Sequence, residues 1–166
     1  MASYYKSITD EQLLLIEKSP LFFVATTAQP ESHPNELVGP INVSPKGGVP
    51  LYIVDRNHVA YLDYAGSGNE TAQHLKAGSP ITVMICSFDE NAAIVRLYGT
   101  GTVTAIEASP LGQQLLASDC KTTGQPLRQV IDVFVEKTAT SCGYGVPIME
   151  FGHHRRKEEH GRKYKT

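Results

Sequence analysis

Six or seven short runs of apolar and β-branched residues follow one another along the chain, and no other feature limits its fold as strongly. The runs lie at residues 21–27, 36–43, 50–54, 59–64, 81–86, 94–104 and about 130–138. Turn-forming residues or short helical stretches separate them, so consecutive strands are expected to pair in an antiparallel way. We therefore expect a mainly β protein, and an antiparallel barrel rather than a parallel sheet with crossover helices.

Two helix starts are recognisable between these runs. Thr9 is followed three residues later by Gln12 and then by an apolar run, which is the form of a capping box. Ser109 precedes Pro110, and a cap followed by proline at the first helical position is a common helix start. We expect short helices at both places, the first of them ending near residue 19.

Two of the strands carry more specific information. The run at 81–86 is almost wholly apolar, as expected of a strand covered on both faces. Short helices offer too little surface to cover a small barrel of this kind, so we expect a homodimer whose symmetric partner covers the rest. The run at 94–104 is interrupted by Gly99 and Gly101, which predicts a bulge or a sharp bend.

The stretch at 59–75, VAYLDYAGSGNETAQHL, joins a strand to a helix through a glycine-rich loop. Asn69 is a preferred N-cap residue, and Glu70 in the first turn suits the positive end of a helix. Backbone N–H groups converge in such a connection and bind anions, above all phosphate. The side chains of Ser67, Asn69 and Thr71 add donors at the same place. An ordinary tight connection gives the same pattern, so the stretch alone leaves both interpretations open.

Composition and charge exclude several classes of protein. The 166 residues suffice for one domain, and 41% hydrophobic with 19% charged residues is ordinary for a globular protein. A formal net charge of −2 gives no general attraction to nucleic acids or anionic membranes. No run approaches the about 20 apolar residues of a membrane span, and the N-terminus lacks the form of a secretory signal. We expect neither a nucleic-acid partner nor a membrane partner.

The three cysteines, Cys86, Cys120 and Cys142, are far apart and odd in number. This spacing argues against a disulfide framework and against a zinc site, and we predict no metal site. Cys86 lies in an apolar run, where a buried thiol is expected. We expect a cytoplasmic protein, because a reducing compartment suits free thiols.

Residues 152–166 differ in kind from the rest of the chain. They hold six Lys and Arg residues and two Glu residues, so six minus two gives a net charge of +4. We expect a domain at 1–151 followed by a basic C-terminal tail at 152–166. The tail would be a solvated or frayed end, with a docking site for an acidic partner as the alternative.

Five short motifs together give the chain a family resemblance. They lie, in this order, at residues 42–47 (NVSPKG), 60–63 (AYLD), 66–71 (GSGNET), 94–101 (IVRLYGTG) and 141–147 (SCGYGVP). Over roughly residues 10–150 the chain resembles the pyridoxamine 5′-phosphate oxidase-like proteins, the FMN-binding split-barrel family. The resemblance implies a six-stranded antiparallel Greek-key split β-barrel with short flanking helices. It also implies a homodimer, with FMN bound at the boundary between the subunits.

The resemblance also implies roles for individual residues of the FMN site. The loop residues that would hold the FMN phosphate are Ser67, Gly68, Asn69 and Thr71. Lys46 would supply a positive charge to the same phosphate, and Arg96 would reach the flavin or the phosphate from its own subunit or from the second one. A doubly negative phosphate needs cations and N–H donors, and these residues provide both.

Three further groups of residues complete the implied site. The backbone of Asn42, Val43 and Ser44 would run beside the flavin ring. Tyr61, Leu62 and Asp63 would flank the ring or the ribityl chain. Cys142 and Tyr144 belong to a loop that would form a wall of the substrate pocket.

From the residues alone, simpler interpretations stay open for three of them. Lys46 lies in a Pro-Lys-Gly sequence and is also typical of a solvated turn. Arg96 on a strand is also expected to pair with a carboxylate such as Asp63. Cys142 is a nucleophile only if its pKa is lowered and a base lies nearby, and the sequence identifies neither.

Departures from the family pattern limit the function that the resemblance implies. The chain has no tryptophan, it lacks an Arg-Leu-x-Pro ending, and it carries Asn69-Glu70 where many relatives place basic residues. We therefore expect an FMN-dependent oxidoreductase acting on an unidentified small molecule rather than on vitamin B6, with its catalytic residues unknown.

Two alternatives to this function remain. One is a non-catalytic protein that binds or sequesters flavin. The other is a split barrel that uses deazaflavin F420 or haem, which for haem requires an axial ligand such as His58 or His74. His58 has the sequence context of a turn residue and His74 that of an exposed helix position, which argues against haem.

Overall fold

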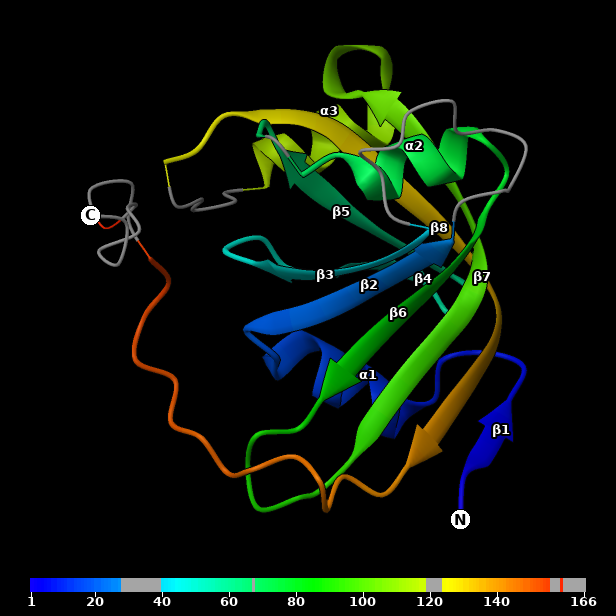
Figure 1. Cartoon of the computed structure of the whole chain (residues 1–166), viewed down its shortest axis with the longest axis vertical. Coiled ribbons are helices and arrows are strands. Elements are labelled where there is room, and N and C mark those ends of the chain that lie inside the picture. The colour runs from blue at the N-terminus through cyan, green and yellow to red at the C-terminus, as the bar shows by residue number, and fades with distance from the viewer. Residues whose placement is uncertain (28–39, 67, 119–123, 156–158, 160–166) are drawn as a thin grey trace.

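The computed structural model of the chain describes residues 1–27, 40–66, 68–118, 124–155 and 159. Its elements, in chain order, are β1 (Ser3–Tyr5), α1 (Asp10–Lys18), β2 (Leu21–Thr27), β3 (Ile41–Gly47), β4 (Tyr52–Asp55), β5 (His58–Tyr64), α2 (Glu70–Lys76), β6 (Pro80–Cys86), β7 (Ile94–Ala105), the 3-10 helix η1 (Ile106–Ala108), α3 (Pro110–Ala117) and β8 (Leu127–Ser141). Figure 1 shows the strands curling around a common interior, with α1 and α2 at different sides of it.

All eight described strands belong to one antiparallel sheet. Its order is β3-β2-β6-β7-β8-β5-β4, and β1 pairs with β8. The expected mainly β split barrel is confirmed, although the sheet holds two more strands than the six expected. One of them, β1, is a three-residue segment whose residues are all exposed, so it has no alternating pattern. We use the word split for the gap between the edge strand β3 and the strand β5, which no ladder of backbone hydrogen bonds joins within the described residues.

Strand β3 lies later in the sequence than predicted. The prediction was 36–43, whereas the strand runs to Gly47 because β2 offers a partner for every residue, from Thr27 opposite Ile41 to Leu21 opposite Gly47. Lys46 is therefore a strand residue and not part of a turn. Residues 28–39, which hold the start of the predicted strand, lie outside the described part of the chain.

The predicted helix signals are confirmed. Thr9 and Gln12 form a reciprocal capping box at the start of α1, and the Ser109 side chain caps α3 by accepting a hydrogen bond from the Gly112 N–H. Asn69 occupies the N-cap position of α2, but its side chain makes no capping hydrogen bond. No helix among the described residues is long and apolar enough to cross a bilayer.

Gly99 marks the predicted irregularity in β7. The register between β7 and β8 shifts between Tyr98 and Gly99. A Cβ atom at Gly99 would lie 1.9 Å from the backbone oxygen of Phe134, which is far below van der Waals contact. Only glycine therefore allows the two strands to approach this closely at the bend.

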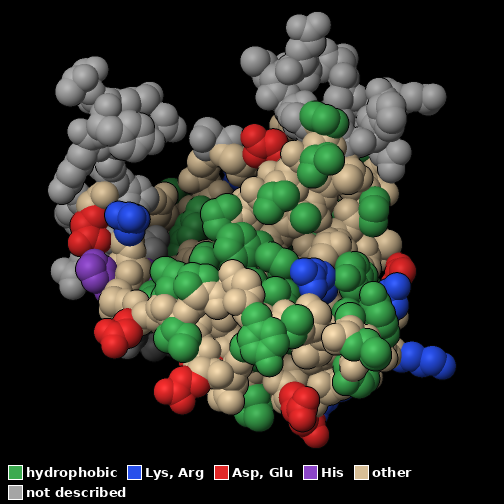
Figure 2. Space-filling view, turned by 60° about the horizontal axis from the view of Figure 1, so that its bottom comes forward, with side chains coloured by type: hydrophobic (Ala, Val, Ile, Leu, Met, Phe, Trp, Pro, Cys, Tyr) green, Lys and Arg blue, Asp and Glu red, His purple; other side chains and the backbone are tan. Residues whose placement is uncertain are grey.

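After β8 the chain crosses the lower side of the barrel without regular secondary structure. The Met149 N–H donates to the Phe88 carbonyl at 2.9 Å, which ties this segment to the loop that follows β6. Several large apolar side chains of the segment are exposed: Tyr144, Ile148, Met149 and Phe151. Figure 2 brings the lower side forward and shows hydrophobic side chains over much of it, with acidic side chains near its border.

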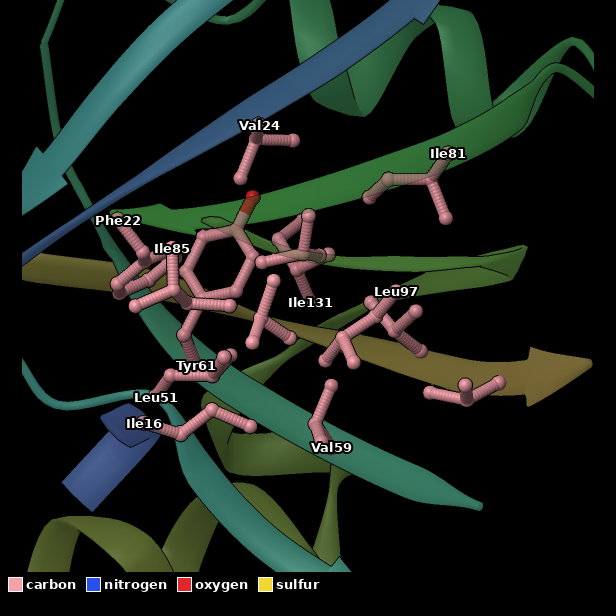
Figure 3. Packing of buried hydrophobic residues seen from close by; sticks show 14 of the residues in the cluster. Ile16, Phe22, Val24, Leu51, Val59, Tyr61, Ile81, Ile85, Leu97 and Ile131 are labelled. Atoms are coloured by element: carbon pink, nitrogen blue, oxygen red, sulfur yellow. The ribbon is translucent and has the colours of Figure 1, made fainter. Parts of the chain in front are cut away.

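The main core fills the interior of the barrel. The side chains of Tyr61, Leu97 and Ile131 are wholly buried there and meet from β5, β7 and β8 (Figure 3). A second apolar cluster, which includes Leu62, lies between β5 and β8 on one side and η1 and α3 on the other. Strand β5 is thus buried on both faces, and apolar packing of this extent is the main term that stabilises the fold.

The expectation that residues 81–86 are covered on both faces holds only in part. The inward residues Ile81, Val83 and Ile85 are buried, whereas the outward residues Thr82 and Met84 are half-buried in the single chain. The outer face of β6 therefore keeps surface that another protein chain could cover.

Candidate functional site

A cluster of polar side chains lies at the split between β3 and β5, and we call it the polar seam. Its members are Asn42, Lys46, Asp63, Asn69, Thr71, Arg128 and Gln129. They come from β3, β5, the start of α2 and the start of β8. Residues of the motifs at 42–47 and 66–71 therefore meet through side chains along this cluster.

Lys46 forms one end of the polar seam. Its Nζ lies 3.0 Å from Asp63 Oδ1 and 5.8 Å from the centre of the Tyr61 ring. The side chain is 15% exposed, so the interpretation of Lys46 as a solvated turn residue is wrong. Its position opposite Phe22, a core residue of β2, turns the side chain toward the barrel interior. Asp63 is its one hydrogen-bond partner among the described residues, and an ammonium group has three donors.

Asp63 is the centre of the polar seam, because both of its carboxylate oxygens are engaged. Oδ1 faces Lys46, while Oδ2 accepts from Arg128 at 3.0 and 3.2 Å and from Gln129 at 2.8 Å. The alternative that Arg96 pairs with Asp63 is therefore wrong. Two cations minus one carboxylate leave the polar seam with one net positive charge.

Arg128 joins Asp63 to the glycine-rich loop. Its Nη1 donates to the Gly66 carbonyl at 3.0 Å, and its Nη2 donates to the Gly68 carbonyl at 2.8 Å. Gln129 adds a link to the helix start, because its Nε2 donates to Asn69 Oδ1 at 3.1 Å. Ser67, which was predicted to touch the phosphate, lies outside the described residues.

Asn42 and Thr71 form the other end of the polar seam. The Asn42 amide donates to Thr71 Oγ1 at 2.8 Å and to Thr26 Oγ1 at 3.4 Å. Thr26 Oγ1 in turn lies 3.0 Å from His74 Nδ1. Asn42 and Lys46 lie on the same face of β3 four residues apart, which is about 13 Å along a strand. The polar seam is thus elongated, with neutral donors at one end and a cation at the other.

His74 is buried, whereas the sequence predicted an exposed helix position. Residues Thr71, Ala72, His74 and Leu75 share the face of α2 that packs on the barrel, and the His74 side chain has no exposed surface. Helical spacing places residues 71, 74 and 75 on one side of α2. Only Leu75 of these three is apolar, so the sequence does not show that this side packs on the barrel. His58 is a strand residue, not a turn residue, and its Nε2 contacts the Asp132 carboxylate.

Tyr61 and Leu62 lie on opposite faces of β5 with no exposed side-chain surface, so only their backbone could border a ligand. Burial, and then the negative charge of Asp63, raise the pKa of Tyr61 well above its usual value. The phenol therefore stays protonated at neutral pH. Its hydroxyl has no hydrogen-bond partner among the described residues.

On β3, the Val43 side chain points away from the interior and is 63% exposed, while Ser44 lies opposite the buried Val24.

Arg96 is not part of the polar seam within one chain. It pairs with Met84 across β6 and β7, and Met84 pairs with Phe23, which faces outward from the barrel. Its guanidinium donates to Ser141 Oγ at 3.0 Å. The predicted site residue Arg96 thus lies on the opposite face of the sheet from Lys46.

A groove of about 790 Å³ lies between the barrel and the segment that follows β8. Its walls include Leu21, Pro45, Tyr64, Phe88, Met149 and Phe151. Neither Cys142 nor Tyr144 lines it, and both are exposed, Tyr144 by 90%. The loop at 142–147 is therefore no wall of this groove.

Cys86 lines the groove from the end of β6. Burial raises the pKa of its thiol, and the nearby positive charge of Arg96 offsets only part of that effect. The thiol is therefore protonated at neutral pH, as expected of a buried and unreactive cysteine. Among the described residues no group of three His, Cys, Asp or Glu side chains is placed to hold a metal ion.

Arg128 and Gln129 are functional candidates that the sequence did not reveal. They precede the predicted last strand, and nothing in their spacing sets them apart from other polar residues near a loop. Pairing of β5 with β8 places Gln129 opposite Asp63. The sequence held a signal only when two segments were considered together. The polar end of the run at 59–64 and the polar residues before the run at 130–138 would lie side by side if these two strands paired.

Comparison with known proteins relates the chain to one group. No protein-family profile matches it. It is 34% identical over 153 residues to ustO of Aspergillus flavus, a pyridoxamine 5′-phosphate oxidase family protein, and the match covers 90% of this chain and 58% of that protein. The chain thus spans less than two thirds of the length of this curated relative.

Solved structures show the same fold at low sequence identity. A crystal structure from Lactobacillus delbrueckii, described as a candidate pyridoxamine 5′-phosphate oxidase, has a TM-score of 0.59 and 21% identity, covering 81% of this chain and 94% of that one. A tagged variant of HupZ from Group A Streptococcus has a TM-score of 0.58 and 19% identity, covering 81% and 99%. At such identities the likeness concerns the split-barrel fold alone.

Proposed function

The chain belongs to the pyridoxamine 5′-phosphate oxidase-like family, and from this premise we propose that it is an FMN-binding flavoprotein that acts as an oxidoreductase on a small molecule. The polar seam is the observation that carries the proposal. It combines one net positive charge with amide and hydroxyl donors at the gap where the barrel is open. An FMN phosphate, with a charge near −2, is favoured by such a set.

The chemistry of the donors fits FMN, which is an elongated ligand with a phosphate at one end. We assign the phosphate to the end formed by Asn42, Thr71 and the loop that reaches Asn69, because the Thr71 hydroxyl and the Asn69 amide are neutral donors there and Asn42 holds Thr71 in place. Lys46 lies about 13 Å along β3 from Asn42, by the rise of an extended strand. We therefore place Lys46 toward the middle of the ligand, where its positive charge still favours the phosphate, because Asp63 and Gln129 connect it to Asn69 by hydrogen bonds.

FMN, when bound, supplies hydride-transfer chemistry, so the protein itself needs to bind, orient and shield. The polar seam suits that division of labour. Asp63 holds Lys46 in a fixed place, and the buried Tyr61 stays protonated beneath it. The seam side chains of Lys46, Asp63 and Arg128 are only 15%, 9% and 24% exposed, so a bound ligand would displace the remaining water from them.

We propose that the protein is a homodimer and that Arg96 approaches the flavin from the second subunit. Arg96 faces outward from β7, beside the half-buried Met84 and Phe23 on neighbouring strands. Phe23 and Met84 keep part of their apolar surface exposed in the single chain, and a symmetric partner would cover it. The unpaired thiols Cys86 and Cys142 agree with a reducing cytoplasm as the location. Light scattering coupled to gel filtration would give the mass, and a monomer would contradict the dimer.

The decisive experiment is the visible spectrum of the purified protein with and without added FMN, together with mass spectrometry of any ligand that copurifies. We expect flavin absorption and saturable binding of FMN. A colourless protein that shows no binding by titration would contradict the flavoprotein proposal.

A second function, flavin binding without turnover, rests on a specific observation. The one carboxylate of the polar seam has both oxygens engaged by Lys46, Arg128 and Gln129, so it is poorly placed to move protons. Reoxidation of bound reduced flavin, measured with a panel of electron acceptors, separates the two. Acceptor-dependent turnover at ordinary enzyme rates would exclude a passive binder.

A further inference from the structure

We propose that Arg128 is a positioning residue for the peptide group between Gly68 and Asn69, at the end of the glycine-rich loop, and that it directs the Asn69 N–H rather than the Gly68 carbonyl oxygen toward an anion. The inference rests on the proposed function, because the anion is the FMN phosphate. It concerns a residue that does not itself touch the ligand.

Arg128 has little left to offer a ligand directly. Its Nε donates to Asp63 Oδ2, its Nη1 to the Gly66 carbonyl, and its Nη2 to both Asp63 Oδ2 and the Gly68 carbonyl. The distances are 3.2, 3.0, 3.0 and 2.8 Å in that order. A guanidinium has five N–H donors, so these four hydrogen bonds use nearly all of them. Arg128 is thus a brace between β5 and the loop.

The hydrogen bond to the Gly68 carbonyl fixes the direction of the peptide group between Gly68 and Asn69. In a trans peptide the C=O and the N–H of the same unit point in opposite directions. No cis peptide bond occurs among the described residues. The Gly68 carbonyl faces Arg128, so the N–H of Asn69, in the same peptide unit, faces away from it. Carbonyl oxygens carry negative partial charge and would repel a phosphate, and Arg128 holds two of them aside.

Asp63 and Gln129 hold Arg128 and the loop in place. Asp63 fixes the guanidinium through two hydrogen bonds, and Gln129 donates to the same carboxylate oxygen while it also binds Asn69. The loop is therefore held at Gly66, Gly68 and Asn69 by two adjacent residues of β8. Arginine suits this role because its planar fork reaches several acceptors at once, which a lysine cannot do.

Two explanations for an effect of Arg128 need to be separated. One is charge, since loss of Arg128 lowers the net charge of the polar seam from one to zero. The other is position. The substitution Arg128→Lys keeps the charge but removes the fork, so it distinguishes them. Riboflavin, which lacks the phosphate, reports on everything except the phosphate site.

The experiment measures the dissociation constants of FMN and riboflavin for the wild type, Arg128→Lys and Arg128→Gln. We expect FMN binding to weaken about tenfold in both variants, the size of one lost charge-assisted hydrogen bond, with riboflavin binding within about twofold of the wild type. The matched control is Arg56→Lys, because Arg56 also donates to a backbone carbonyl (Ile8) and a carboxylate (Asp10) but lies outside the seam. It should change neither constant.

Three outcomes would overturn the inference. If Arg128→Lys binds FMN as the wild type does, charge alone matters. If both ligands weaken equally, Arg128 is merely structural. If the wild-type Asn69 amide resonance shifts as much on addition of riboflavin as on addition of FMN, that N–H does not face the phosphate. Absence of any flavin binding by the wild type would instead overturn the proposed function, and this inference with it.

Discussion

The inner face of β5 changes character within five residues. Val59 and Tyr61 are wholly buried in the apolar core, while Asp63, the next residue on the same face, is the centre of the polar seam. Apolar packing in the core depends on volume and tolerates similar side chains. The polar seam depends on a single set of partners, because a buried charge without its counter-ion is strongly unfavourable. One strand thus serves both the stability of the barrel and a specific site.

The difference teaches where changes should affect folding and where they should affect binding. In the core, a substitution alters packing that many residues share. In the polar seam, Lys46 and Arg128 both depend on Asp63, so single substitutions there should propagate to named neighbours. The following experiments test this contrast, from the largest expected effect to the smallest.

Gly99→Ala should have the largest effect, and it acts on the barrel itself. The added Cβ would lie 1.9 Å from the Phe134 backbone oxygen, so β7 and β8 would have to separate. We expect a loss of at least about 3 kcal/mol in the free energy of unfolding, measured by chemical denaturation. The control is Gly145→Ala, whose Cβ would meet nothing within 4 Å. Equal stability of the two variants would contradict the strand geometry.

Asp63→Asn should come next, and it acts on the polar seam. It leaves Lys46 and Arg128, whose side chains are 15% and 24% exposed, facing an uncharged amide. Breaking a buried pair typically costs 3–5 kcal/mol, so we expect about 2–3 kcal/mol at this partly open site. Asp10→Asn is the control, because the Arg56–Asp10 pair is exposed and should contribute less than about 1 kcal/mol. If denaturation finds equal losses, the seam is no more specific than the surface.

The double substitution Lys46→Ala with Asn69→Ala should affect ligand binding more than folding. Asp63 keeps Arg128 and Gln129 as partners, so the barrel should remain folded. Charged hydrogen bonds to a ligand are worth about 1.5–3 kcal/mol each, so FMN binding should weaken at least about tenfold in a fluorescence titration. Lys137→Ala, which removes an exposed lysine near Tyr4 and Tyr98, should leave the affinity unchanged. Unchanged affinity in the double variant would mean that the FMN site lies elsewhere.

Asp89 should show the smallest effect, and it tests a surface ion pair against the buried one. A hydrogen bond from Lys18, then hydrogen bonds from Ser87 and the Asn91 N–H, lower the pKa of Asp89 to about 2. The native state therefore favours the ionised carboxylate. The stability it adds is present above the unfolded-state pKa, near 4, and is lost as the pH falls toward 2. Asp89→Asn should flatten the dependence of the melting temperature on pH in that window only, and an identical pH profile would contradict the assignment.

Much of the fold was predictable, because its signals are local. The capping residues Thr9 and Ser109 act on helix starts a few residues away, and the runs of apolar and β-branched residues that form β2 and β5 are continuous in the sequence. Gly99 was recognisable as a bend for the same reason. The end of β3 was not recognisable from the sequence. A Pro-Lys-Gly sequence is typical of a turn unless a neighbouring strand offers partners up to Gly47.

The site was predictable only in outline. Lys46, Asp63, Asn69 and Thr71 lie in motifs that the sequence displays, and the structure brings them into one polar seam. Arg96 and Tyr144 also lie in motifs, yet within one chain the structure keeps them apart from it. Motifs identify residues that are chemically suited to a task, but they do not say which face of a sheet each residue occupies relative to the others.

By itself, the sequence determined the mainly β barrel, the helix caps and the glycine bend, because each depends on residues that are near one another in the chain. Only the tertiary structure decided that Arg128 and Gln129 reach Asp63 and the loop at 66–69, that His74 lies inside, and that Lys46 and Asn42 occupy opposite ends of the polar seam. The physical reason is the register of the curled sheet. Antiparallel pairing of β5 with β8 brings together residues more than sixty positions apart, and such pairings leave no local trace in the sequence.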